Sequence, residues 1–129
     1  MLKANDDVSK EKLDIIKAEK KVFSYMGLSA RAGHIASGEF STEKSVKTGK
    51  ACLVIVALDA SDNTKKMFKN MCAYYDVPLY FFGNKEQLGH AIGKEFRASL
   101  AFLDNGLADA TCKQLKIAID TGGSDYVKN

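Results

Sequence analysis

The apolar positions of the chain alternate between the spacing of helices and the spacing of strands. The run CLVIVAL (52–58) is continuously apolar and rich in β-branched residues, which is typical of a strand covered on both faces. Apolar residues in 22–28, 67–75 and 108–119 recur at helical spacing instead. The same criteria predict the remaining elements, which are strands at 34–37, 78–82 and 99–103 and helices at 41–48 and 84–92.

This alternation predicts an α/β fold, a three-layer α/β/α sandwich of about four strands and five helices. Short connections between such elements favour one sheet with helices on both faces. A chain of 129 residues suits a single domain, which we place at residues 18–121. Residues 1–17 are expected to form a polar N-terminal extension, either frayed or helical over a turn or two, and residues 122–129 a C-terminal tail.

Charge and composition set loose limits on function. The net charge is +3 and the pI is about 8.7, which permits nucleic-acid binding without requiring it. No apolar run approaches the roughly 20 residues of a membrane span. The first residues are charged throughout and lack the apolar core of a signal peptide. We therefore expect a cytoplasmic protein with no membrane partner.

The cysteines Cys52, Cys72 and Cys112 agree with this location. They are odd in number, widely spaced and set in apolar stretches, which predicts three buried free thiols in a reducing compartment. A metal site would need paired ligands such as C-x-x-C, and none is present. His34 and His90 are isolated in the sequence. We therefore expect neither a metal site nor any other cofactor.

Motifs typical of enzymes are missing from the sequence. It contains no G-x-G-x-x-G, no Walker-type phosphate loop and no G-x-S-x-G elbow. Asp59 follows a buried strand, as the nucleophile of an aspartyl phosphotransferase does. Ser61, however, stands where such an enzyme needs a second acid to hold magnesium. The alternative is a turn in which Asp59 or Ser61 caps the next helix, and we expect no catalytic residue.

The segment 28–48 carries the candidate binding chemistry. Gly38 lies in the turn from the short strand into a Lys-rich helix, and Arg31 and His34 precede that turn. Lys44 and Lys47 are three residues apart and so share one helix face. A helix N-terminus with flanking lysines suits a phosphate group. The alternative is a solvated Lys-rich helix with no ligand.

Two ordered runs of residues carry a family resemblance. The first joins Gly38, Lys44 and GKA (49–51) to the buried strand and to DASDNTKK (59–66). The second comprises VPL (77–79) and LGHAIGKEFR (88–97). Together they resemble the ribosomal-protein superfamily of the L7Ae and L30e types, which binds kink-turn RNA. The resemblance covers about residues 20–119 and is closest to its stand-alone bacterial branch, often called YlxQ-like.

The resemblance implies an RNA site at one end of the sandwich, beginning with the turn at Gly38. The family turn has the pattern Gly-x-Asn-Glu-x-x-Lys, and Gly38 and Lys44 keep its ends. Phe40 and Ser41 replace the Asn and Glu, which in the family hydrogen-bond to guanine edges. Phe40 cannot form such bonds, but it can stack on a base. The alternative for Phe40 is packing into the core at the start of the helix.

The loop GKEFR (93–97) is the second part of the implied site. In the family this loop packs on an extruded nucleotide, and here it combines a cation, an aromatic ring and an arginine. We interpret it as a platform for stacking and for phosphate contact. The alternative is a helix C-cap at Gly93 with solvated charges.

The resemblance implies a non-catalytic RNA-binding protein of ribosomal type. The expected partners are structured RNA, including ribosomal RNA, and ribosomal proteins. The alternative is a protein-interaction module that kept the fold and lost specific RNA binding. The candidate RNA-binding residues are Arg31, His34, Gly38, Glu39, Phe40, Ser41, Lys44, Lys47, Lys94, Phe96 and Arg97.

Overall fold

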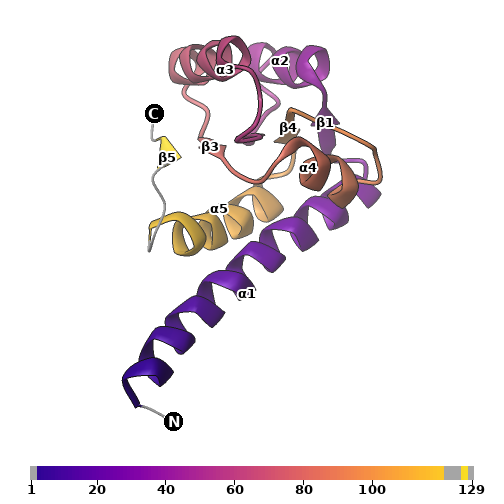
Figure 1. The fold of residues 1–129 in the computed structure, drawn as a ribbon. Coiled ribbons are helices and arrows are strands. Elements are labelled where there is room, and N and C mark those ends of the chain that lie inside the picture. Colours follow the sequence, from indigo (N-terminus) through magenta and orange to yellow (C-terminus); the bar gives the residue numbers. More distant parts are fainter. Residues whose placement is uncertain (1–2, 121–125, 128–129) are drawn as a thin grey trace.

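The computed structural model describes residues 3–120 and 126–127, with five helices alternating with five strands (Figure 1). The predicted alternation is confirmed, and most element bounds shift by a residue or two. No helix within the described residues is long and apolar enough to cross a bilayer. In chain order the elements are α1 (Lys3–Arg31), β1 (Ile35–Ser37), α2 (Glu39–Lys47), β2 (Leu53–Val56), α3 (Asp62–Tyr75), β3 (Leu79–Phe81), α4 (Lys85–Ala91), β4 (Ser99–Phe102), α5 (Asn105–Asp120) and β5 (Tyr126–Val127).

The sheet is mixed, with strand order β1-β4-β2-β3-β5. β2 is central, because it pairs in parallel with β3 and antiparallel with β4. β1 also pairs antiparallel with β4, through Ser37 opposite Leu100. β1, β2 and β3 therefore run in one direction, and their carboxyl ends lie at the same sheet edge as the amino end of β4. Helices α2, α3 and α4 all begin at that edge.

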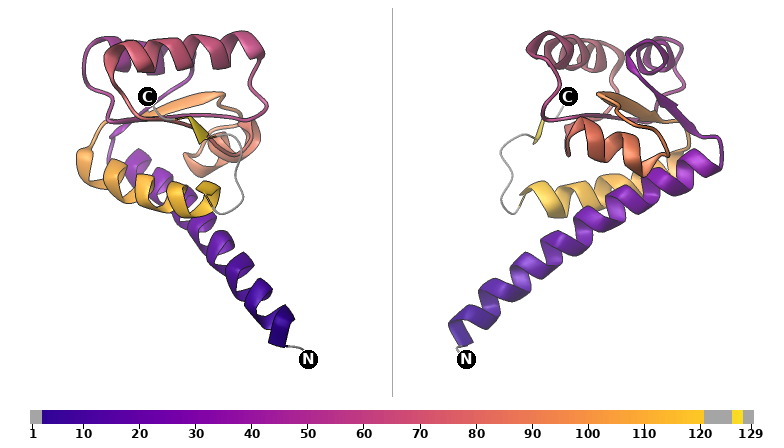
Figure 2. Two further views of the ribbon diagram at one scale, coloured as in Figure 1. Left: turned by 90° about the vertical axis from the view of Figure 1, so that its left-hand side faces the viewer. Right: turned by 45° about the vertical axis from the view of Figure 1, so that its right-hand side comes forward.

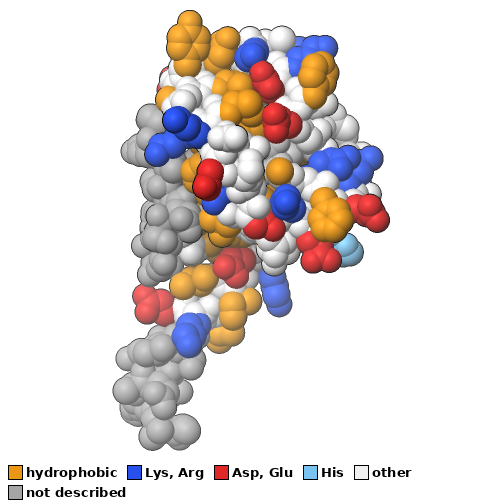
Figure 3. All heavy atoms as spheres, turned by 45° about the horizontal axis from the view of Figure 1, so that its top comes forward, with side chains coloured by type: hydrophobic (Ala, Val, Ile, Leu, Met, Phe, Trp, Pro, Cys, Tyr) orange, Lys and Arg blue, Asp and Glu red, His pale blue; other side chains and the backbone are white. Residues whose placement is uncertain are grey.

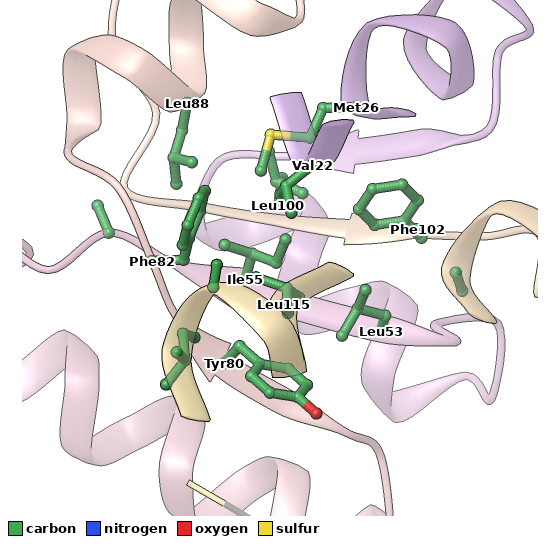
Figure 4. Close-up of a cluster of buried hydrophobic side chains, with 14 of the residues drawn as sticks. Val22, Met26, Leu53, Ile55, Tyr80, Phe82, Leu88, Leu100, Phe102 and Leu115 are labelled. Atoms are coloured by element: carbon green, nitrogen blue, oxygen red, sulfur yellow. The ribbon is translucent and has the colours of Figure 1, made fainter. Parts of the chain in front are cut away.

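Helices cover both faces of the sheet, which confirms the predicted three layers (Figures 1 and 2). Val46 of α2 and Phe68 of α3 pack on one face. On the other face, α1, α4 and α5 bury Val22, Leu88 and Leu115 against the sheet, as Figure 4 shows. The four residues of β2 are all buried, as their continuous apolar run predicts.

Helix α1 is much longer than the sequence predicted. It runs unbroken from Lys3 to Arg31, and its first half projects away from the body (Figures 1 and 2). The expectation of a frayed segment or a turn or two at residues 3–17 is therefore wrong. The stretch 3–26 contains no glycine or proline and includes six lysines, which favour a helix. The domain boundary between residues 17 and 18 stays a prediction.

Two smaller expectations are corrected. β5 pairs antiparallel with β3, so two residues of the segment expected as a tail belong to the sheet and raise its strands from four to five.

Cys72 is buried, and burial raises the pKa of its thiol to about 12. Cys52 and Cys112 are only half-buried, because they lie at the margin of the core. The expectation of three buried thiols therefore holds for Cys72 alone.

Candidate nucleic-acid interface

The turn between β1 and α2 is fixed by the backbone of Gly38. Its φ of 89° and ψ of 159° belong to a backbone region that residues other than glycine rarely adopt. The Gly38 amide donates a 3.0 Å hydrogen bond to the carbonyl of Ser99, at the start of β4. Three helices begin at this edge, and α2 alone among them has no side-chain cap in the described residues. The first amides of α2 are thus left for a ligand or for water.

Phe40 points into solvent rather than into the core. Its side chain is 76% exposed, so the alternative of core packing is wrong. The residue buried at this helix start is Thr42, whose hydroxyl accepts a 3.3 Å hydrogen bond from Ser99 Oγ. Ser41 and Lys44 are exposed beside Phe40. Since Lys44 follows Phe40 by four residues, the ring and the ammonium group share one side of α2.

Lys47 is held by an acidic neighbour. Its Nζ lies 2.8 Å from Glu43 Oε2, one helical turn earlier. This hydrogen bond and the charge of Glu43 raise the pKa of Lys47. Lys47 is therefore protonated at neutral pH, and the carboxylate of Glu43 partly neutralises its charge. Both lysines lie in the last turn of α2. Lys44 is nearer than Lys47 to the turn at Gly38 by three residues, and it has no ion pair like that of Lys47 among those found in the described residues.

The loop between α4 and β4 exposes a second aromatic ring. Phe96 is 59% exposed, and Lys94 and Glu95 are exposed beside it. Gly93 has a φ of 79° and follows directly on the last turn of α4, as the helix-ending alternative required. The helix-ending interpretation of Gly93 is therefore confirmed, and residues 94–96 are displayed to solvent, whereas their use as a binding platform stays a prediction.

Arg97 joins this loop to the turn at Gly38. Its Nε donates a 3.0 Å hydrogen bond to Ser37 Oγ, across 60 residues of sequence. Its Nη1 donates to the carbonyl of Phe96 at 2.7 Å, and its backbone amide donates to the carbonyl of Lys85 at 3.0 Å. The side chain is half-buried as a result. We call residues 37–44 and 93–97, which this contact brings together, the turn–loop surface.

Asp59 has a structural task at the same edge. Its Oδ1 accepts a 2.8 Å hydrogen bond from the backbone amide of Lys85, at the start of α4. Ser61 caps α3 by accepting from the amide of Thr64, as the capping interpretation predicted. The Thr64 hydroxyl in turn donates to Glu39 Oε1 at 3.4 Å. The described residues contain no group of acidic, His or Cys side chains that could hold a metal ion.

Two of the predicted residues lie outside the turn–loop surface. His34 precedes β1, and its carbonyl accepts from the amide of Leu103, just after β4. This is the end of β1 opposite the turn. Arg31, in the last turn of α1, lines a hollow of about 320 Å³ together with His90 and Gly93. The structure therefore separates both residues from Gly38, although Arg31 adjoins the beginning of the loop.

One residue that the sequence did not assign a role is Gly89, in the middle of α4. It is buried, and a Cβ placed on it would lie 2.6 Å from the carbonyl oxygen of Glu95. A lone glycine inside a helical pattern is the signal that could have revealed this close approach. Ser37 and Ser99 were likewise missed, because their partners lie some 60 residues away in the sequence.

The face formed by α2 and α3 carries mixed charges. Figure 3 views the molecule from this side, and Lys and Arg side chains alternate there with acidic and hydrophobic ones. No single sign of charge dominates the view. Binding of a polyanion would therefore depend on particular cations, such as Lys44 and Lys94, rather than on a broad basic field.

Comparison with known proteins gives one consistent result. Residues 20–112 match the ribosomal protein L7Ae/L30e/S12e/Gadd45 family. The RNA-binding protein YlxQ of Enterococcus faecium is 38% identical over 92 residues, which is 71% of this chain and 88% of that protein. The large ribosomal subunit protein eL30 of Candida albicans is 36% identical over 99 residues, covering 72% and 90% of the two chains. A 15.5 kD RNA-binding protein of Giardia lamblia superposes with a TM-score of 0.67 at 25% identity, covering 78% of this chain and 90% of the other.

Proposed function

Because the chain belongs to the ribosomal protein L7Ae/L30e/S12e/Gadd45 family, we propose that it is a non-catalytic RNA-binding protein that uses its turn–loop surface. The observation that carries this proposal is the contact between Arg97 and Ser37, which sets the two segments side by side. The exposed rings of Phe40 and Phe96 flank that contact in the sequence. RNA-binding relatives and a ribosomal relative support the same class of function.

The surface offers the two kinds of contact that RNA binding needs. Lys44, Lys94 and the uncapped start of α2 suit phosphate oxygens, which provide most of the affinity. The exposed faces of Phe40 and Phe96 suit unpaired bases, because stacking accepts any base. The proposed ligand is therefore an RNA in which a folded backbone lies close to extruded bases.

A kink-turn or a related structured RNA meets that description, and ribosomal RNA is one source. The ribosomal relative supports a role in translation, hence a cytoplasmic location, with ribosomal proteins as neighbours. The specific RNA is proposed from the family resemblance. Phe40 and Ser41 set a limit on it, since neither can make the paired hydrogen bonds to guanine edges that the family's Asn and Glu make.

One observation favours a second candidate function, a protein-interaction module that lost specific RNA binding. The exposed Phe40 is an apolar side chain at a position where the family has a hydrogen-bonding one, and exposed aromatic side chains also serve protein interfaces. The first candidate explains more of the surface, because it also uses the cations of both segments.

A salt titration tests the proposal. Filter binding of a kink-turn RNA should give an affinity that falls with salt, and each lost phosphate contact should flatten the log–log slope by roughly 0.7–0.9 unit. The variant Lys44→Gln with Lys94→Gln should therefore flatten the slope by about 1.4–1.8 units. The control, Lys113→Gln with Lys116→Gln, changes two exposed lysines of α5 and should leave it unchanged. Equal slopes for both variants would mean that Lys44 and Lys94 do not contact the RNA. No RNA binding by the unmodified protein would favour the protein-interaction module.

A further inference from the structure

We propose that Gly89 is a positioning residue for RNA binding: by lacking a side chain it seats the 94–96 loop directly on α4 and so presents Phe96 in a fixed place. The inference rests on the proposed function and goes beyond it. It assigns part of the binding strength to a buried residue that touches no RNA.

The close approach at Gly89 involves backbone on both sides. A Cβ built there would lie 2.6 Å from the Glu95 oxygen, 2.7 Å from the Glu95 carbonyl carbon and 2.8 Å from the Phe96 nitrogen. Real Cβ atoms do not come this near to other heavy atoms, and backbone atoms cannot rotate away as the end of a side chain can. Even alanine at this position must therefore displace the loop or the helix.

The conformation of α4 does not itself require a glycine here. Gly89 lies inside a regular helix and is not among the residues with positive φ. A helix interior with glycine is less stable than one with alanine. The space that glycine leaves for the loop is therefore the physical reason for its presence at this position.

Hydrogen bonds hold the loop along the whole of α4. The amide of Lys94 donates to the carbonyl of Gly89 at 2.8 Å, and the amide of Gly93 donates to that of His90 at 3.1 Å. At the other end of the helix, the amide of Arg97 donates to the carbonyl of Lys85 at 3.0 Å. The loop backbone is thus tied to both the first and the last turn of α4.

The backbone of Phe96 is fixed from two sides while its ring stays free. Its nitrogen packs on Gly89, and its carbonyl accepts from Arg97 Nη1, whose Nε is bonded to Ser37. The ring is nevertheless 59% exposed. A side chain displayed on a fixed backbone loses less conformational freedom on binding than one on a mobile loop. Arg97 accordingly acts in part by positioning Phe96, and not only as a cation.

The test is a thermodynamic cycle on RNA binding. Phe96→Ala should weaken binding of a kink-turn RNA by about tenfold, which is within the usual effect of losing one stacked base. Gly89→Ala should weaken it to a similar extent, and the double variant should be no weaker than about twice either single one, because both changes remove the same contact. The control is Gly106→Ala, a helix glycine of α5 whose added Cβ would meet only the side-chain oxygen of Asp104; it should bind as the unmodified protein does.

Two outcomes overturn the inference. One is Gly89→Ala binding as tightly as the unmodified protein. The other is a Gly89→Ala loss that multiplies fully with that of Phe96→Ala, since a general loss of stability would act in that way. The absence of RNA binding by the unmodified protein overturns the proposed function itself, so the two failures are distinguishable.

A second pair of variants decides the matter if Gly89→Ala does not fold. Ser37→Ala removes the other tie on the loop, and its loss of affinity should likewise vanish in a Phe96→Ala background. Ser37→Thr keeps the hydroxyl and should restore binding. A full, independent loss for Ser37→Ala, or no recovery with Ser37→Thr, contradicts the positioning account.

Discussion

At the residue scale, two exposed aromatic rings determine what the turn–loop surface can recognise. Phe40 and Phe96 offer π faces to unpaired bases, whereas Ser41 offers one short hydroxyl. The identity of these residues is visible in the sequence, and so is their departure from the family pattern. Their exposure cannot be read from the sequence, because an apolar residue at a helix start can pack inward or outward. In the structure Thr42 is the residue buried at the start of α2, and Phe40 faces solvent.

Discrimination between RNAs should be weak as a result. A pair of hydrogen bonds to a base edge contributes about 1–3 kcal/mol of discrimination, and stacking contributes little because it accepts any base. We predict that an intact kink-turn and a variant with disrupted G·A pairs bind within about tenfold of each other, as measured by filter binding. Phe40→Asn with Ser41→Glu should widen that gap. A preference above a hundredfold in the unmodified protein would assign specificity to Lys44 or to the 93–97 loop instead.

At the element scale, the site depends on pairings between segments far apart in the chain. The periodicity of apolar residues predicted the helices and strands, and the candidate caps Asp59 and Ser61 predicted a helix start soon after the buried strand, where Ser61 caps α3. Nothing in that periodicity places β4 between β1 and β2. The contact of Arg97 with Ser37 follows from this strand order, so its role as a connector could not be predicted from the sequence.

The central strand offers a test of the architecture. Val54 is fully buried and pairs with Ala101 of β4 on one side and with Leu79 of β3 on the other. An unpaired charge buried there costs several kcal/mol, which is a large share of a small domain's stability. Val54→Asp should therefore abolish cooperative thermal unfolding, as followed by circular dichroism.

The matched control for that experiment is Tyr74→Asp. It introduces the same carboxylate on α3 at a residue that is 81% exposed, so the melting temperature should change little. A folded Val54→Asp protein with a normal melting transition would mean that β2 is not the centre of the sheet.

At the scale of the whole molecule, a family domain carries an added helical arm. The family match begins at residue 20, whereas α1 begins at Lys3 and projects from the body (Figure 2). The first buried side chain described in this helix is Ala18. The sequence predicted a polar extension here because its apolar residues are few. It did not predict that the helix continues through it, since helix propensity without an apolar stripe is a weak signal in a sequence.

Shortening this arm tests where the domain begins. Removal of residues 1–12 leaves Ala18, Val22 and Met26 in place, so the melting temperature should fall by only a few degrees. Removal of residues 1–22 deletes two of these core side chains and should unfold the domain or lower its melting temperature by tens of degrees. Equal melting temperatures for the two shortened proteins would contradict the boundary near residue 18.

NMR chemical-shift changes can map the bound RNA on the protein. A kink-turn RNA should shift the amide signals of residues 38–44 and 93–97 most strongly, with little change along α5 and the projecting half of α1. The signals of Lys94 and Arg97 should stay narrow before and after binding, because their amides are already bonded to α4. Shifts centred on α5 or on the helical arm, with the turn–loop surface unaffected, would show that RNA binds elsewhere on the protein.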